Sequence, residues 1–465
     1  MTLLDIIALL IGLSAVGGYL NHHVLKLPHT IGLVVVALAA SGGVLAIDHL
    51  NPSLEIAKEV TGALREVDFQ KALMEGMLSA LLFAGAAHVD LTELAERKWA
   101  IGLMATIGVL LSTFIVGGAI WAVASGLGFN LPFIWALVFG ALISPTDPVA
   151  VLGILKTVKI PRLLQAKIAG ESLLNDGVGV VIFSILVVIA TGAGGHGGEM
   201  TVAAIAQLFV WEAFGGAALG LIGGLIAYGM MRTLEERYIE VMITIALVTG
   251  VYALALKLHV SGPIAVVVAG LLIGNQGARF AMGEDTRRHV FQFWELTDEI
   301  LNSVLFLLIG LEVLVIAFSP EHTSLALLAI PIVLVARLIA VAIPIGFLRL
   351  RTEFTSGAVR ILTWAGLRGG ISVALALSLP SGEFKPIILT MTYAVVVFSI
   401  VVQGLTVERL VRAVVRDAAE ISPHSMAATT DEISAASEAT MSEDDSGNLL
   451  DSGGKRAKRR RRGKH

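Results

Sequence analysis

Long runs of apolar residues, separated by short polar breaks, are the feature that most limits the fold of this chain. A helix needs about 20 mostly apolar residues to cross the hydrocarbon core of a bilayer. Because backbone groups in lipid must be satisfied within their own segment, such runs predict an all-α polytopic membrane protein with about 13 transmembrane helices. The approximate limits of the runs are 3–20, 29–47, 71–89, 99–125, 132–155, 165–191, 203–231, 238–257, 261–275, 295–317, 324–348, 358–379 and 386–407.

The overall composition supports the same class. Hydrophobic residues make up 56% of the chain and charged residues only 15%, whereas soluble domains carry about 25% charged residues. The chain has no cysteine, which excludes disulfides, thiolate catalysis and cysteine-bound metal. The first apolar run lacks a basic segment before it and a convincing cleavage site, so we expect a membrane span there and no cleavable signal peptide.

Positive charge divides unevenly between the loops on the two sides of the predicted membrane. Eighteen Lys and Arg residues fall on one side, and the other side has only Lys58, Arg65, Lys71, Lys257 and Lys385. Loops rich in positive charge stay in the cytoplasm. We therefore expect an inner-membrane protein with its N-terminus outside and its C-terminus in the cytoplasm, which agrees with an odd number of spans.

The character of the chain changes after residue 417. Residues 418–450 are rich in Ser, Ala, Thr, Asp and Glu, and a basic cluster follows at 455–462. Such a segment cannot bury enough apolar surface to fold. We therefore predict a transmembrane domain over 1–417 and a disordered cytoplasmic tail over 418–465. The basic cluster either contacts anionic lipid or is merely solubilising charge.

Polar residues inside the sixth apolar run indicate a functional site. The segment Gly170–Gly179 holds two carboxylates, a hydroxyl and an amide, and a continuous apolar stretch follows it. On a helix Ser172 lies one turn from Asp176, and Glu171 lies one turn from Asn175. Too few apolar residues follow Asp176 to span a bilayer, so the helix must begin earlier and Asp176 lies near the middle of the membrane. Carboxylates at that depth usually face a cavity or a partner, which favours function over a charged collar at the helix end.

A second polar segment interrupts the fifth apolar run. Pro145 and Pro148 flank Thr146 and Asp147 there, and each proline removes a backbone donor and clashes with the preceding turn. Carbonyls freed in this way are tolerated in a membrane only where they line a cavity or bind something. A simple kink would not need an aspartate, so we interpret this break as part of the site.

The twelfth run has a comparable break at Gly366–Gly370, which contains Arg368. Because the fifth and twelfth runs are seven spans apart, they enter the membrane from opposite sides. Paired interrupted segments of opposite orientation are typical of inverted-repeat transporters, whose site lies between the breaks. We therefore predict repeats over about 1–191 and 238–410, joined by a linker helix at 203–231, with two broken helices that cross.

One arginine lies deep in the eleventh run. Arg337 is surrounded by apolar residues in the sequence, and a charge at that depth needs an anionic partner. Glu171 and Asp176 are the natural candidates, and a structural ion pair is as plausible as a role in chemistry.

Two motifs now carry a resemblance to a known family. Ser144–Val151 (SPTDPVAV) and Gly170–Asp176 (GESLLND) resemble the signature segments of monovalent cation:proton antiporters, and most closely those of the bacterial NhaP type. Phe83–Leu91 (FAGAAHVDL) and Trp364–Ser372 (WAGLRGGIS) are also similar to that family. The resemblance spans most of residues 1–415 in order, and the tail lies outside it.

The resemblance implies a thirteen-helix homodimer with a moving six-helix core. It implies that sodium or lithium is exchanged for a proton, that no cofactor is needed, that the protein is not an enzyme and that nucleic acid is not a partner. The residues that would hold the ion by this resemblance are Asp176, Ser172, the Asp147 carboxylate and the Thr146 carbonyl. Asn175 would order the site, Glu171 would pair with Arg337, Arg368 would offset carbonyl ends, and Asp90 is a candidate for an acidic ligand from the third span.

The chemistry of these residues is compatible with such an exchange. Oxygen ligands suit a hard alkali cation. A buried carboxylate can be neutralised by a proton or by a cation, so competition for Asp176 would give exchange. Because Asn175 is an amide and cannot titrate, we expect one proton per cation and electroneutral transport.

Potassium/proton exchange is the alternative within transporters, because carboxylate and hydroxyl oxygens do not fix the ionic radius. A channel, a receptor and an intramembrane enzyme are other classes, although common catalytic motifs such as His-Glu-x-x-His are missing from the sequence.

Overall fold

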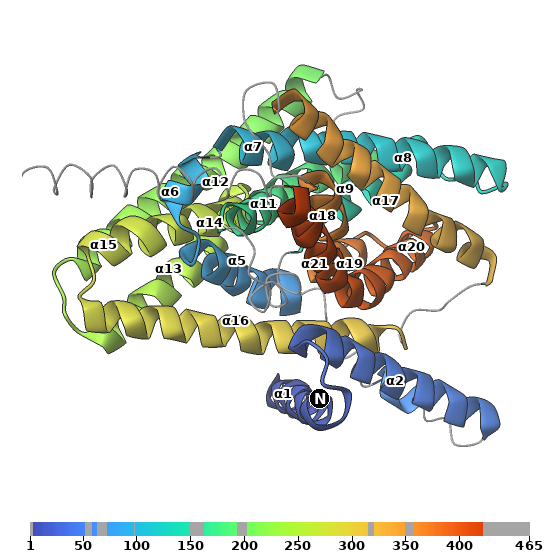
Figure 1. Ribbon diagram of the computed structural model, residues 1–465, viewed down its shortest axis with the longest axis horizontal. Coiled ribbons are helices and arrows are strands. Elements are labelled where there is room, and N and C mark those ends of the chain that lie inside the picture. Colours follow the sequence, from blue (N-terminus) through green and yellow to red (C-terminus); the bar gives the residue numbers. More distant parts are fainter. Residues whose placement is uncertain are drawn as a thin grey trace, which may run out of the picture. The chain divides into compact units, whose positions relative to one another are not determined.

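A computed structural model describes residues 3–51, 58–62, 72–96, 98–147, 162–192, 202–314, 320–348 and 357–421. These residues are almost entirely helical (Figure 1). The first helices are α1 (Leu3–Leu20), α2 (His29–Leu50), α5 (Leu78–Ala87), α6 (Leu91–Glu96), α7 (Lys98–Leu103), α8 (Val109–Gly126), α9 (Phe133–Ile143) and α11 (Arg162–Thr191). The later helices are α12 (Val202–Met231), α13 (Arg237–Leu258), α14 (Gly262–Leu272), α15 (Ala278–Phe280), α16 (Glu284–Glu312), α17 (Pro320–Leu348), α18 (Ala358–Trp364), α19 (Gly370–Leu377), α20 (Lys385–Phe398) and α21 (Gly404–Ile421).

Short π-helical segments join several of these helices. They are η1 (Asn21–Leu25), η3 (Ala72–Met77), η4 (Met104–Gly108), η5 (Ile273–Gly277) and η6 (Ser399–Gln403). For example, η4 continues directly into α8, and η6 joins α20 to α21 without a loop.

The helices confirm the predicted class of an all-α polytopic membrane protein. Within the described residues, nine helices are long and apolar enough to cross a membrane, and Ala72–Ala87 and Phe133–Ile143 are shorter apolar helices. The count of 13 spans stays a prediction, because α18 and α19 are short pieces and residues 148–155 lie outside the described part. The orientation of the termini, the two repeats and the tail boundary also stay predictions, and residues 422–465 lie outside the described part.

Helix α16 differs from the predicted span at 295–317. It begins at Glu284 and ends at Glu312. The apolar pattern of the sequence does not mark its first half, because that half is polar. Glu284 and Asp285 occupy its first turn, where the helix dipole favours negative charge. Val290 and Trp294 are buried along the same half, so packing of one helical face stabilises a segment whose mean hydropathy is low.

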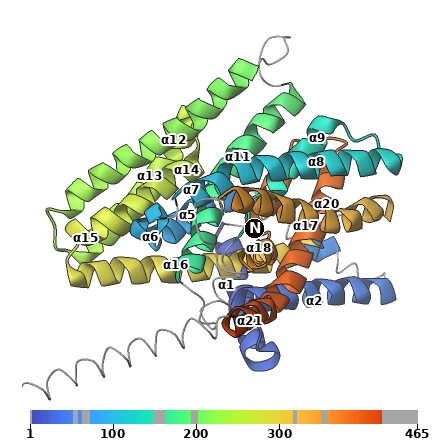
Figure 2. The ribbon, with the colours of Figure 1, turned by 45° about the horizontal axis from the view of Figure 1, so that its top comes forward.

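The helices of the segment Met1–Arg412 pack as two groups. In one group α8, α9, α11, α17, α19 and α20 contact one another. In the other, α14 packs on α5, α12 and α13, while α16 packs on α2, α5 and α13. Helix α11 also contacts α12 and α14, and Figure 2 shows it between α12 and α9. The residues of α11 therefore lie where the two groups meet.

The two predicted breaks meet each other. Helix α9 ends at Ile143, and α18 and α19 are separated by residues 365–369. The Asp147 backbone N–H donates to the Leu367 carbonyl over 2.8 Å, which makes an isolated antiparallel bridge. Each broken segment thus satisfies part of the backbone that the other leaves unpaired, as the interior of a membrane protein requires.

Candidate functional site

The polar segment of α11 is buried without interrupting the helix. Asp176 lies near the middle of the thirty-residue helix. Glu171, Ser172, Asn175 and Asp176 are each at most 6% exposed. Their spacing puts all four on the part of α11 that faces the breaks, as the one-turn separations predict. The described structure therefore buries two carboxylates, a hydroxyl and an amide in one short stretch.

Glycine lets the first break approach α11 closely. A Cβ on Gly179 would overlap the ring of Pro145, so only glycine fits there without displacing the break. At the second break a Cβ on Gly369 would overlap the Asp147 carboxyl group. These two glycines allow Asp147 to lie between α11 and the second break.

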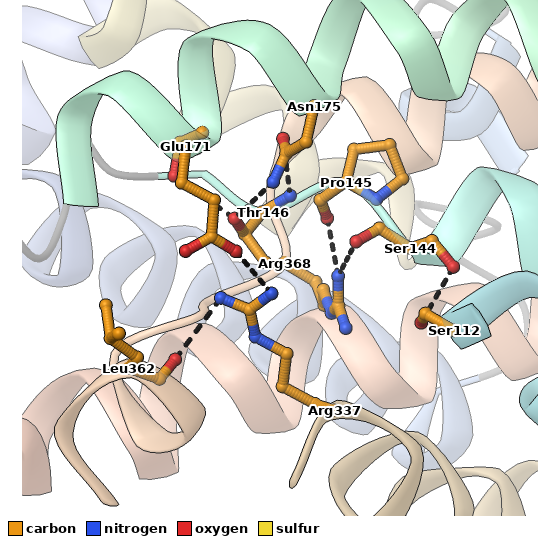
Figure 3. Close-up of polar contacts among 10 residues, drawn as sticks. Ser112, Ser144, Pro145, Thr146, Glu171, Asn175, Arg337, Leu362 and Arg368 are labelled. Carbon is orange, nitrogen blue, oxygen red and sulfur yellow. Dashed lines mark hydrogen bonds and ion pairs between the residues drawn. The ribbon is translucent and has the colours of Figure 1, made fainter. Parts of the chain in front are cut away.

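Asn175 holds Thr146 in place through two hydrogen bonds (Figure 3). Its Nδ2 donates to Thr146 Oγ1 over 2.8 Å, and the Thr146 backbone N–H donates to Asn175 Oδ1 over 3.3 Å. The Thr146 hydroxyl is also 3.1 Å from the hydroxyl of Ser172. An amide is suited to this position because it both donates and accepts, which explains in physical terms the ordering role expected for Asn175.

The two aspartates come together from different elements. Asp147 is half-buried at the first break, and Asp176 is buried on α11. Their carboxylates are close enough to repel each other electrostatically. A bound cation or a proton lowers the repulsion between two neighbouring carboxylates, so the two ligands can compete at this place.

Arg368 occupies the second break and contacts the first. It is 2% exposed, and its Nη1 donates to the carbonyl oxygens of Ser144 and Pro145, the latter over 2.7 Å (Figure 3). Its backbone N–H donates to Ser399 Oγ over 2.9 Å. The structure therefore places this guanidinium on the carbonyls that the proline break leaves without helical partners.

Glu171 and Arg337 lie together in the same buried region. Glu171 Oε1 is 2.6 Å from Arg337 Nη1, and the two side chains are 2% and 10% exposed. Arg337 Nη2 also donates to the Leu362 carbonyl over 3.3 Å. Arg337 thus joins α11 to the end of α18. Of the two anionic partners considered from the sequence, Glu171 is the one in contact.

Asp90 lies elsewhere. It is exposed at the turn between α5 and α6, and its Oδ1 accepts a hydrogen bond from the Thr92 backbone N–H over 2.7 Å. This is the position of a residue that caps a helix N-terminus. The structure therefore does not bring Asp90 to the buried site.

Sequence reasoning missed the hydroxyl groups that support the first break. Ser144 Oγ donates to the Gly140 carbonyl over 2.6 Å and lies within hydrogen-bond distance, 2.8 Å, of Ser112 Oγ. Ser399, which accepts from Arg368, donates to Gln403 Oε1 over 2.7 Å. Small polar residues in otherwise apolar runs were the available signal, because such residues often form hydrogen bonds between membrane helices.

The arrangement can bind a hard cation chemically. Carboxylates, hydroxyls and backbone carbonyls are oxygen donors of the kind that alkali cations prefer. Within the described residues no three His, Cys, Asp or Glu side chains form a group that could hold a metal ion. The carboxylates of the candidate ligand set are those of Asp147 and Asp176.

Comparison with known proteins points to one family of transporters. A family model described as the transmembrane sodium/hydrogen exchanger matches residues 10–413. The Na+/H+ antiporter NhaP of Pseudomonas aeruginosa is 49% identical over 417 residues, covering 89% of this chain and 97% of that protein. The antiporter NhaH of Halobacillus dabanensis is 34% identical, covering 83% and 92%.

A solved structure shows the same fold. The sodium proton antiporter MjNhaP1 from Methanocaldococcus jannaschii matches with a TM-score of 0.67 at 18% identity, covering 88% of this chain and 97% of that one. The fold class predicted from the apolar runs and the two breaks is therefore confirmed. By the family model and the sequence identities together, the chain belongs to the sodium/hydrogen exchanger family, within its bacterial NhaP-type members.

Proposed function

We propose that this protein is a secondary transporter that exchanges sodium or lithium for protons, and that Asp176 binds either the cation or the proton. One observation carries the proposal: a carboxylate that is 6% exposed lies near the middle of α11, beside the place where two broken helices cross. Discontinuous membrane helices of this kind provide the ion sites of secondary transporters. The relatives named above are called Na+/H+ antiporters.

In this proposal the ligands divide into binding and positioning groups. Asp176, Asp147, Ser172 and the Thr146 carbonyl bind the cation. Asn175 positions Thr146 by the two hydrogen bonds described above. Proton binding at Asp176 removes the charge that holds the cation, so the two substrates exclude each other at one group.

Fixed charges around the site support one-for-one exchange. Arg337 is paired with Glu171, and Arg368 lies on carbonyl oxygens close to the backbone that carries Asp147. If Glu171, Asp147 and both arginines keep their charges, a protonated Asp176 leaves the group neutral. An ionised Asp176 with one bound sodium ion leaves it neutral as well. Transport would therefore move one cation one way and one proton the other.

The remaining properties follow from the family. We propose that the protein acts as a homodimer in the inner membrane, takes part in sodium and pH homeostasis, needs no cofactor and is not an enzyme. We propose sodium rather than potassium as the substrate because the relatives named above are called Na+/H+ antiporters.

Ion flux in proteoliposomes tests the function. Sodium, lithium or potassium is added outside vesicles that enclose a pH dye, and the membrane voltage is clamped with potassium and valinomycin in the sodium and lithium experiments. Sodium and lithium should drive proton movement at any clamped voltage, while potassium should have little effect. Proton movement driven by potassium alone would identify a potassium exchanger. Net sodium movement driven by voltage at equal pH and sodium would contradict one-for-one exchange.

A further inference from the structure

A small cavity lies on the side of the second break that faces α17. It has a volume of about 10 Å³, and its walls include Arg337, Thr363, Arg368 and Gln403 among apolar side chains such as Val333. A cavity of about this volume holds one water molecule. None of the proposed cation ligands lines this cavity, so the cavity is separate from the cation site.

Three buried polar atoms in the walls have no protein partner in the described part of the chain. They are Arg337 Nε, Arg368 Nη2 and Thr363 Oγ1. The two arginines are fixed by other contacts: Arg337 by Glu171, and Arg368 by two carbonyls. A buried polar group left without a hydrogen bond costs free energy, and three such atoms around one cavity indicate a common ligand.

We propose that this cavity binds one water molecule that joins the two arginines. The water oxygen accepts from Arg337 Nε–H and Arg368 Nη2–H, and one water hydrogen is donated to Thr363 Oγ1. Buried waters make about three such bonds, and the three atoms match that number. The accepting oxygen also lies between two guanidiniums of like charge, where it lowers their repulsion.

The volume and the surrounding charges decide between water and a small anion. Chloride or bromide would also accept from both arginines, but each is larger than a water molecule and the cavity holds about one water-sized sphere. An anion would add a negative charge to a group that is already balanced in the proposed transport cycle. Water fits both conditions.

The bound water makes Thr363 a positioning residue for the cation site. Thr363 acts through Arg368, whose other guanidinium nitrogen holds the carbonyls of Ser144 and Pro145 next to Thr146 and Asp147. This part of the inference rests on the proposed function. Loss of the hydroxyl should therefore weaken sodium binding without removing any ligand.

The first test is a crystal structure of the full chain, grown with sodium bromide in place of chloride, at a resolution where other buried waters are visible. The expected result is a peak between Arg337 Nε, Arg368 Nη2 and Thr363 Oγ1 without bromine anomalous signal. An anomalous peak there would show an anion site, and a cavity without any peak would overturn the proposal. Neither outcome depends on whether the protein transports sodium.

The second test compares three variants in detergent and in proteoliposomes. Thr363→Val removes the hydroxyl at nearly equal volume, and Thr363→Ser keeps it. Thr392→Val is the control, because buried Thr392 donates only to Ile388 within its own helix over 2.7 Å. Thr363→Val should lower the melting temperature and raise the sodium KM by roughly threefold to tenfold, the equivalent of one net hydrogen bond. Thr363→Ser should restore both values. Equal behaviour of Thr363→Val and Thr392→Val would contradict the proposed role.

Discussion

Loss of either member of the ion pair of Glu171 and Arg337 should destabilise the folded protein strongly. Its two side chains are 2% and 10% exposed, and the nitrogen–oxygen distance is 2.6 Å. At an effective dielectric constant of about 20, unit charges about 4 Å apart attract by about 4 kcal/mol. Removing one member leaves the other charge buried without compensation, which typically costs about 3–5 kcal/mol.

A double-mutant cycle measures this effect. Glu171→Ala and Arg337→Ala should each lower the free energy of unfolding by about 3–5 kcal/mol, because each leaves an unpaired buried charge. The double variant should lose less than the sum of the two, with a coupling energy of about 2–3 kcal/mol. Unfolding by sodium dodecyl sulfate in mixed micelles, followed by circular dichroism, gives the three free energies.

The chain contains a matched control for burial. Arg412 Nη2 and Glu408 Oε1 are also 2.6 Å apart, but their side chains are 61% and 39% exposed on α21. Exposed pairs four residues apart on a helix contribute only about 0.3–0.5 kcal/mol. The same cycle with Glu408→Ala and Arg412→Ala should therefore give a coupling near that small value. Additive losses for Glu171 and Arg337, or equal coupling in the two pairs, would refute the reasoning.

Three further predictions concern packing, positioning and the tail. Gly179→Ala should displace Pro145, lower the free energy of unfolding by about 1–3 kcal/mol through overpacking, and reduce proton flux. Gly118→Ala is the control, because a Cβ there has open space, and it should change neither the melting temperature nor the flux. Asn175→Ala leaves the Thr146 backbone N–H without its partner, which costs about 1–3 kcal/mol. Titration of proton flux with sodium should therefore show a raised sodium KM, and an unchanged KM would contradict the positioning role. A chain truncated after Asp417 should exchange ions like the full chain in proteoliposomes, because the tail has no apolar periodicity; a truncated protein that inserts but fails to transport would disprove this.

The architecture and much of the site could be predicted because a membrane makes polar residues informative. Asp147 and Asp176 stand out because carboxylates are costly in an apolar run, and Pro145 marks a break because it removes a backbone donor. Opposite entry of the two broken runs was enough to predict that they meet. The polar first half of α16, however, could not be predicted from apolar runs, because its stability comes from burying one helical face.

Individual contacts could not be derived from the sequence. Ser112, Ser144 and Ser399 could have bonded only within their own segments, and the packed structure shows that they also form hydrogen bonds with other segments. Glu171 and Asp176 were both possible partners of Arg337. Which of them pairs with Arg337 depends on the side of α11 that faces α17. Asp90 was a candidate ligand only by the family resemblance. An acidic residue after an apolar run can cap a helix or bind an ion, and the sequence does not distinguish these roles.

The central claim is that Asp176 is the group at which sodium and the proton compete. The most direct measurement is the exchange of radioactive sodium across proteoliposomes with equal pH and equal sodium on both sides, for the unchanged protein, Asp176→Asn and the surface control Glu408→Gln. An amide keeps the size of the side chain but carries no charge and no titratable proton. Asp176→Asn should abolish sodium exchange while its insertion and melting temperature stay close to those of the unchanged protein, and Glu408→Gln should exchange normally. Sodium exchange by Asp176→Asn at the rate of the unchanged protein would contradict the account.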